Sequence, residues 1–199
     1  FYQPKGVLID PMLLSTLPKR FIHDGMGEVI KYGCIRDLAL FELLEKLDDQ
    51  SIFEHWEEII ERCCQSKADI VEHDVFDMGE RMMLNFGHTI GHAIEGCYGF
   101  GHYTHGEGVA AGMSMLTGVT EAMGLTKAGT TARLRKVIKQ YGLPTDVDAS
   151  AEDLIPYISN DKKMRGNHIT LVIIEEIGKA RLLPLAAEDL PKYIRKKDA

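Results

Sequence analysis

The chain has 199 residues, 45% of them hydrophobic, and a formal net charge of −7, which leaves room for one well-packed domain. Acidic and basic residues are interspersed, and no apolar run approaches the roughly 18 residues of a membrane-spanning helix, so neither nucleic acid nor a membrane is indicated as a partner. The four cysteines show no CxxC spacing, which is typical of reduced thiols in a cytoplasmic protein.

A short apolar segment, KGVLIDP at residues 5–11, comes first in the chain and is closed by a proline. Its pattern predicts a β-strand, and no comparable strand follows before residue 168. Because a single strand needs a sheet to join, we expect its partners in an α/β domain that precedes this chain. Residues 1–11 are therefore predicted to form a boundary strand.

A helix-rich body follows. After a short turn at 12–17, apolar residues at helical spacing predict helices over five segments: 25–47, 51–72, the segment that carries His88 and His92, 106–123 and 126–141. Thr126 is the expected N-cap of the last of these helices, and residues 142–144 are expected to stop it. Ser150 and Asp153 resemble a capping box that begins a further short helix.

The C-terminal part departs from this helical pattern. Residues 168–185 combine a β-branched run, a Glu-Ile-Gly-Lys turn and a second apolar run, which predicts a β-hairpin. Residues 187–197 have the pattern of a final amphipathic helix. We therefore predict one mainly α domain over residues 1–199, with a single β-hairpin near its C-terminus.

Four of the eight histidines lie between residues 84 and 107, in the stretch LNFGHTIGHAIEGCYGFGHYTHGE. On a helix, His88 and His92 project from the same face, and His105 opens the next helix, where its ring can turn back toward that face. A histidine pair of this spacing is as often a surface or packing feature as part of a metal site. Glycine is unfavourable within helices, so its frequency here indicates close approach of backbone or ligand at positions 87, 91, 96, 99, 101, 106, 108 and 112.

A carboxylate in a helical apolar setting favours the metal interpretation. Glu28, Lys31 and Tyr32 share one helical face in the segment MGEVIKYG at 26–33. One carboxylate with two or three imidazoles suits a zinc-like divalent ion with an open coordination position. The sequence therefore predicts a metal centre built from Glu28 and the histidines of the central stretch.

Three motifs in the chain, GEVIKYG, LNFGHTIGHAIE and HGEGVAAGM, resemble the signatures of the 3-dehydroquinate synthases, within the wider sugar-phosphate cyclase family. The likeness runs from Phe1 to about Leu185. It implies a helical metal-binding C-terminal domain that follows an NAD-binding α/β domain. It also implies a zinc- or cobalt-dependent lyase that uses bound NAD to convert 3-deoxy-D-arabino-heptulosonate 7-phosphate to 3-dehydroquinate and phosphate, a step of the shikimate pathway of aromatic amino acid biosynthesis.

The same resemblance assigns roles to individual residues. It makes Glu28, His88 and His105 the metal ligands, and His92 a residue on the substrate or base side, with a packing role as the alternative. Cationic side chains that could neutralise the phosphate and carboxylate of the substrate are Lys31, Lys67, Arg81 and Lys162, although the likeness leaves open whether Lys162 or Lys163 faces the substrate. Asn85 could offer its amide to substrate hydroxyls.

The chain shows no Gly-rich dinucleotide loop on a strand–helix unit. We therefore expect NAD to be bound mainly by the preceding domain, and the fragment alone to be inactive. A homodimer is the default expectation for the full-length enzyme. The alternatives are an iron- or zinc-dependent polyol or alcohol dehydrogenase, a related sugar-phosphate cyclase, and a non-catalytic helical module.

Overall fold

The computed structural model describes residues 4–74, 79–99, 101–158 and 167–194. The α-helices of this part of the chain are α1 (Lys19–Ile35), α2 (Leu38–Leu44), α3 (Trp56–His73), α4 (His88–Tyr98), α5 (His105–Ala122), α6 (Thr130–Gln140) and α7 (Ala151–Ile158). One hairpin, β1 (His168–Glu176) and β2 (Lys179–Ala186), forms a two-stranded antiparallel sheet. Short 3-10 helices are η1 (Pro11–Thr16), η2 (Ser51–His55), η3 (Glu80–Asn85) and η4 (Ala187–Tyr193). The predicted fold class, mainly helical with one C-terminal hairpin, is confirmed.

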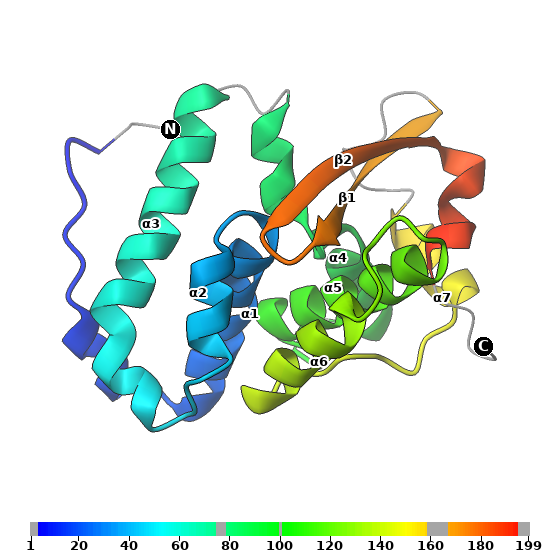
Figure 1. Ribbon diagram of the computed structural model, residues 1–199. Coiled ribbons are helices and arrows are strands. Elements are labelled where there is room, and N and C mark those ends of the chain that lie inside the picture. Colours follow the sequence, from blue (N-terminus) through cyan, green and yellow to red (C-terminus); the bar gives the residue numbers. More distant parts are fainter. Residues whose placement is uncertain (1–3, 75–78, 100, 159–166, 195–199) are drawn as a thin grey trace.

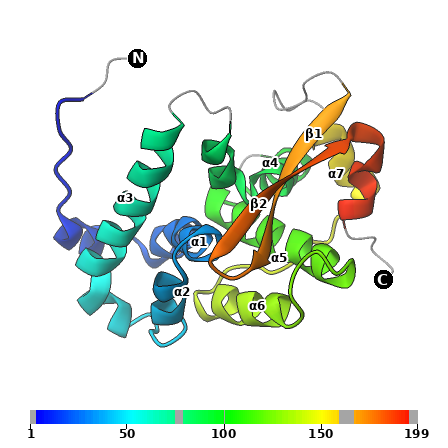
Figure 2. The ribbon, with the colours of Figure 1, turned by 45° about the horizontal axis from the view of Figure 1, so that its top comes forward.

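Helix α5 lies at the centre of the molecule, because it contacts α4, α1, α6 and β1. In Figures 1 and 2, α3 and the N-terminal segment form one flank, while the hairpin runs over the inner helices toward α7 and η4 at the opposite flank. One continuous cluster of buried apolar residues joins these elements. Among the described residues, no helix combines the length and the apolar character needed to cross a membrane.

Glycines bring α4 and α5 into backbone contact. A Cβ atom at Gly112 would lie 2.3 Å from the carbonyl oxygen of Gly87, and one at Gly91 would lie 3.0 Å from the carbonyl carbon of Gly108. At Gly106, which follows His105, the backbone N–H donates to the Asp24 carboxylate of α1 at 2.5 Å. The close approach predicted from the glycines is confirmed in part. It is an approach to backbone at positions 87, 91, 106, 108 and 112, whereas Gly96 meets the Tyr157 ring and Gly99 and Gly101 have no neighbouring atom within 4 Å.

The helix predicted over 25–47 is wrong in its boundaries, because the structure contains two helices there. Arg36 leaves the helical conformation, and the side chain of Asp37 accepts a hydrogen bond from the Leu40 N–H at 2.9 Å, which caps α2. The helix predicted over 51–72 begins with the 3-10 turn η2 and continues as α3. Apolar spacing alone did not reveal either change, because buried apolar residues occur in the elements before and after each break.

Asn85, predicted to contact substrate hydroxyls, does not belong to the helix that carries His88 and His92. Asn85 ends η3, and Gly87 adopts a left-handed conformation, with φ of 79°, between η3 and α4. Helix α4 therefore begins at His88, and His105 opens α5 as expected.

The predicted N-cap at Thr126 is wrong. Thr126 is buried and its hydroxyl donates to the carbonyl of Ile174 at 2.6 Å, which ties the segment before α6 to β1. Helix α6 begins four residues later, where the Glu121 carboxylate accepts hydrogen bonds from the N–H groups of Gly129 and Thr131. A side chain from α5 therefore caps α6.

The capping box predicted at Ser150 and Asp153 is confirmed, because each side chain accepts a hydrogen bond from the backbone N–H of the other residue. The stop after α6 is confirmed at Gly142, which has a φ of 67°. The amphipathic helix expected over 187–197 is instead the 3-10 helix η4 over Ala187–Tyr193, and residues 195–199 lie outside the described part of the chain.

Residues 4–10, where a boundary strand is predicted, form no strand in this chain. Their apolar side chains are exposed, most of all Leu8 at 97%. A strand needs a neighbour to satisfy its backbone groups, and among the described residues β1 and β2 pair only with each other. The preceding domain that would supply the partner strands stays a prediction.

Candidate metal and substrate site

Three helices each bring one side chain of a type that binds metal ions to the same place. Glu28 lies in the middle of α1, and His88 and His105 are the first residues of α4 and α5. The Glu28 Oε1 atom lies 3.2 Å from Nε2 of His88 and 3.5 Å from Nε2 of His105. One ligand atom from each residue lies within 4.8 Å of those of the other two. The three residues that the resemblance implies as ligands are therefore brought together.

The backbone before α4 orients His88. Its Nδ1 lies 3.1 Å from the carbonyl oxygen of Phe86, which can only accept, so Nδ1 carries the proton. This leaves the Nε2 lone pair pointing toward Glu28. Phe86 is fully buried, and the His88 side chain itself is only 12% exposed, so packing holds this ring in place.

The start of α5 is fixed by a capping box. The Thr104 hydroxyl accepts from the Glu107 N–H, and the Glu107 carboxylate accepts from the Thr104 N–H at 2.7 Å. His105 is thereby placed at the first helical position. Its side chain is 44% exposed, so its ring is held less by packing than that of His88.

The Glu28 carboxylate is surrounded by nitrogen atoms. Its Oε2 accepts from Nζ of Lys31 at 2.5 Å. Burial alone would raise the pKa of Glu28, and the hydrogen bond and charge of Lys31 oppose this. Lys31 therefore favours the ionised carboxylate, which is the form that a metal ligand must take.

The contacts of Oε1 test whether these residues fit a metal ion. This atom is buried and accepts no hydrogen bond from the described residues, although two imidazole nitrogens lie close by. Donor atoms that converge without hydrogen bonding to one another are what a cation site requires. One carboxylate with two imidazoles leaves a coordination position open, as catalytic zinc sites do. The residues fit a divalent cation.

Lys31 and Lys67 both lie beside this cluster. The Lys31 side chain is almost fully buried, at 4% exposure. Burial lowers the pKa of its ammonium, the charge of Glu28 opposes this, and the nearby charge of Lys67 on α3 lowers it further. Lys67 is exposed, so it faces solvent close to the site. The structure therefore brings both lysines to the cluster, and their contacts with a substrate stay predictions.

His92 follows one turn after His88 and is exposed. Its ring centroid lies 5.6 Å from that of His88 and 5.8 Å from that of His105. Together with Glu95, the His92 and His105 rings form a second group whose ligand atoms lie within 4.8 Å of one another. Glu95 was not among the predicted site residues, although its position three residues after His92 on the same helix was a usable signal.

Among the remaining predicted substrate residues, Arg81 and Asn85 lie in η3. This 3-10 helix packs against α3 and α1 and leads through Gly87 into His88. The backbone N–H of Arg81 donates to the Asp74 carboxylate at 3.1 Å. Lys162 falls outside the described residues, so its predicted role is not tested.

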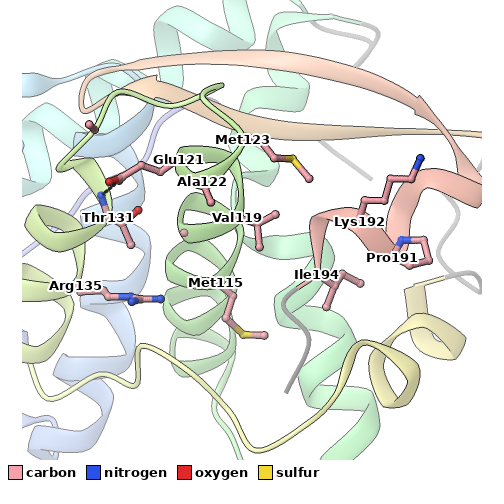
Figure 3. Close-up of a pocket in the computed structure, with 12 residues that line it drawn as sticks. Met115, Val119, Glu121, Ala122, Met123, Thr131, Arg135, Pro191, Lys192 and Ile194 are labelled. Carbon is pink, nitrogen blue, oxygen red and sulfur yellow. Dashed lines mark hydrogen bonds between the residues drawn. The ribbon is translucent and has the colours of Figure 1, made fainter. Parts of the chain in front are cut away.

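A groove of about 800 Å³ lies elsewhere, between the C-terminal half of α5, α6 and η4. Figure 3 shows Met115, Val119 and Ile194 among its lining residues. At 1.5 Å per residue along α5, Met115 is about 15 Å from His105. The Glu121 carboxylate of this groove is engaged in capping α6. Among the described residues, the groups of side chains that could hold a metal ion lie at the histidine cluster instead.

Comparison with known protein families gives a match over most of this region. The family described as 3-dehydroquinate synthase C-terminal matches residues 25–164. A 3-dehydroquinate synthase from Clostridium acetobutylicum is 49% identical over 197 residues, which cover 98% of this chain and 55% of the relative. One from Streptococcus pneumoniae is 47% identical over 199 residues, which cover 98% and 56%. The chain spans about half the length of these curated relatives.

Two solved structures share this architecture. The 2-epi-5-epi-valiolone synthase of Streptomyces hygroscopicus subsp. jinggangensis 5008, solved with NAD+ and Zn2+, has a TM-score of 0.81, is 21% identical, and the match covers 93% of this chain and 53% of that one. A 2-deoxy-scyllo-inosose synthase complexed with carbaglucose-6-phosphate, NAD+ and Co2+ has a TM-score of 0.79, is 23% identical, and the match covers 94% and 55%. At these identities the likeness shows the fold alone.

Proposed function

Because the chain belongs to the 3-dehydroquinate synthase C-terminal family, we propose that it is the metal- and substrate-binding part of a cyclising lyase. The proposed reaction converts 3-deoxy-D-arabino-heptulosonate 7-phosphate to 3-dehydroquinate and phosphate, with NAD as a recycled cofactor. The observation that carries the proposal is the convergence of Glu28, His88 and His105 from three helices, within the residues that the family matches.

In this proposal, Glu28, His88 and His105 hold a zinc or cobalt ion. When bound, such an ion lowers the pKa of a coordinated hydroxyl group and polarises a neighbouring carbonyl group. Lys31 holds Oε2 of Glu28, which turns Oε1 toward the two imidazoles and keeps the carboxylate ionised. The exposed His92 ring lies beside both ligand rings, where it can move a proton on a bound substrate without holding the ion.

The cationic residues around the cluster give the proposed substrate its counter-charges. Lys31, Lys67 and Arg81 are the proposed partners of the phosphate and carboxylate groups, with Lys162 as a further one. Lys31 carries its charge at a buried position next to Glu28, and Asn85 is proposed to hydrogen bond to substrate hydroxyls. These side chains bind and orient the substrate, and the hydride transfers belong to the cofactor.

We propose that NAD is bound mainly by a part of the full-length protein outside this chain. In the described residues, the strand–turn–strand hairpin is the sole sheet, and it offers no strand–helix unit of the dinucleotide-binding kind. A cytoplasmic location fits the four free cysteines. A homodimer of the full-length protein is part of the same proposal.

The decisive experiment supplies the full-length protein with the heptulosonate phosphate and catalytic amounts of NAD. We expect release of phosphate and formation of 3-dehydroquinate without net NADH. Steady accumulation of NADH would instead indicate a polyol or alcohol dehydrogenase. Phosphate release from other sugar phosphates, but not from this one, would indicate a sibling cyclase.

Metal analysis of purified variants tests the proposed ligands. His88→Ala and His105→Ala should abolish retention of stoichiometric zinc or cobalt, because each removes one of three protein ligands. His92→Ala is the matched control from the same helix face, and it should retain the metal while losing rate. If the wild type holds no metal and Glu28→Ala changes nothing, the chain is a non-catalytic helical module.

A further inference from the structure

We propose that Glu95 is a positioning residue for the metal centre, and that it holds the imidazole of His105 with Nε2 facing the metal ion. This inference rests on the proposed function, because it assumes the metal centre at Glu28, His88 and His105. Glu95 would not be a ligand. It would act through His105, by fixing the tautomer and the orientation of that ring.

The two nitrogens of the His105 ring face two different carboxylates. Nδ1 lies 3.4 Å from Oε2 of Glu95, whereas Nε2 lies 3.5 Å from Oε1 of Glu28. A carboxylate oxygen can only accept when ionised, so Nδ1 must donate its proton to Glu95. The Nε2 lone pair is then free on the side of the metal ligands. Histidines that bind metals commonly donate the other ring N–H in this way.

His88 shows the same arrangement with a different partner. Its Nδ1 faces the carbonyl oxygen of Phe86 at 3.1 Å, and its Nε2 faces Glu28. The backbone therefore orients His88, and a side chain orients His105. The difference follows from their surroundings, because the His88 side chain is 12% exposed and the His105 side chain is 44% exposed. The more exposed ring has more rotamer freedom to lose, so it depends more on a hydrogen-bonding partner.

The contact between α4 and α5 places Glu95 for this role. Glu95 lies on α4, and its side chain is 21% exposed. Its Cγ atom lies 3.5 Å from the position that a Cβ atom at Gly108 would occupy. The stem of Glu95 therefore packs over a glycine of α5, three residues after His105. This packing limits the movement of the carboxylate that meets Nδ1.

A direct role for Glu95 as a ligand is the competing interpretation. Glu95, His92 and His105 form their own group of ligand atoms within 4.8 Å. Both histidines of that group are exposed, whereas the Glu28 group contains a buried oxygen atom without a hydrogen bond and a well-packed histidine. The Glu28 group is better preorganised, and His105 already directs Nε2 toward it. The geometry therefore favours Glu95 as the partner of Nδ1.

Cobalt binding to the full-length protein tests this proposal without measuring activity. Co2+ is titrated into metal-free wild type, Glu95→Ala and Glu95→Gln in competition with a chromophoric chelator, and the visible absorption bands of the bound ion are recorded at saturation. Loss of a hydrogen-bonding partner of a metal-binding histidine typically weakens affinity about 10- to 100-fold, which we expect for Glu95→Ala. The amide oxygen in Glu95→Gln still accepts from Nδ1, so we expect a smaller loss, below about tenfold, and an unchanged spectrum.

His92→Ala completes the series, and should leave both cobalt affinity and spectrum unchanged. An affinity of Glu95→Ala within twofold of wild type would overturn the positioning role. An altered spectrum in Glu95→Gln, together with weaker binding in His92→Ala, would make Glu95 and His92 ligands and also overturn it. If Glu95→Ala does not fold, the spectrum of Glu95→Gln decides the question. A wild type that binds no Co2+, or binds it equally well after Glu28→Ala, would refute the metal centre itself.

Discussion

The crossing of α4 and α5 can be tested with a single methyl group. In Gly112→Ala, the new Cβ atom would lie 2.3 Å from the carbonyl oxygen of Gly87, whereas ordinary contacts begin near 3.4 Å. The two backbones must therefore separate by about 1 Å. Overpacking of this kind costs about 1–3 kcal/mol, and the higher helix propensity of Ala returns about 1 kcal/mol. We expect a net loss of up to about 2 kcal/mol in the free energy of unfolding.

Gly118→Ala on the same helix is the matched control. Its Cβ atom would meet the end of the long Arg135 side chain at 3.3 Å and a methyl group of Thr131 at 3.7 Å. A shift of a few tenths of an ångström relieves these contacts, so most of the helix propensity gain of up to about 1 kcal/mol should remain. Urea denaturation of both variants should thus show shifts of opposite sign. Equal shifts would refute the close-crossing explanation. Because Gly87 precedes His88, we also expect weaker Co2+ binding in Gly112→Ala than in Gly118→Ala.

Three further predictions concern single contacts and the metal itself. The Arg133 guanidinium donates to both oxygens of Glu45 and holds the pKa of that carboxyl below its usual 4.5. At pH 7, Glu45→Gln should lower the free energy of unfolding by about 0.5–1 kcal/mol, a modest loss because Arg133 is partly exposed. The control variant, Glu42→Gln, should change it hardly at all. Because the folded-state pKa is lowered, this difference should begin to shrink as the pH falls below about 4.5 in urea titrations, and should be lost once the pH has passed below the lowered folded-state pKa. Thr104→Ala removes the capping box before His105 and should lower the free energy of unfolding by about 1 kcal/mol, measured by thermal or urea unfolding. The same variant should also retain Co2+ less well. Adding Co2+ at 100 times its Kd should raise the free energy of unfolding by about 2.7 kcal/mol; no stabilisation would mean that the ion also binds the unfolded chain or does not bind at all.

The family resemblance implied the set of proposed metal ligands, and their positions depend on local features that a sequence displays. His88 and His105 both begin helices, and the Thr104–Glu107 box and the glycine before His88 are visible as residue types. Glu28 lies within a regular helix, where spacing fixes which side chains share its face. What the sequence could not supply was the direction in which each ring turns, because that depends on Phe86 and on neighbouring helices.

The errors have a common physical cause, which is that tertiary contacts outweigh local preference. Thr126 has the right residue type for an N-cap, yet its hydroxyl bonds to β1, and Glu121 caps α6 from another helix. Asn85 follows a helical pattern, yet the left-handed Gly87 separates it from α4. In each case the deciding partner is distant in sequence or depends on a backbone conformation that apolar spacing does not encode.

The placement of two helix starts at one cluster also explains why the carboxylate there must be ionised. His88 and His105 are the first residues of α4 and α5, and a helix N-terminus carries a partial positive charge of about half a unit. Two such ends, together with the buried Lys31, would repel a divalent cation. The negative charge of Glu28, which Lys31 favours, offsets this repulsion at the one oxygen that faces both imidazoles. The same positive ends would also favour anionic groups near the cluster, which is consistent with the proposed phosphorylated acid as substrate.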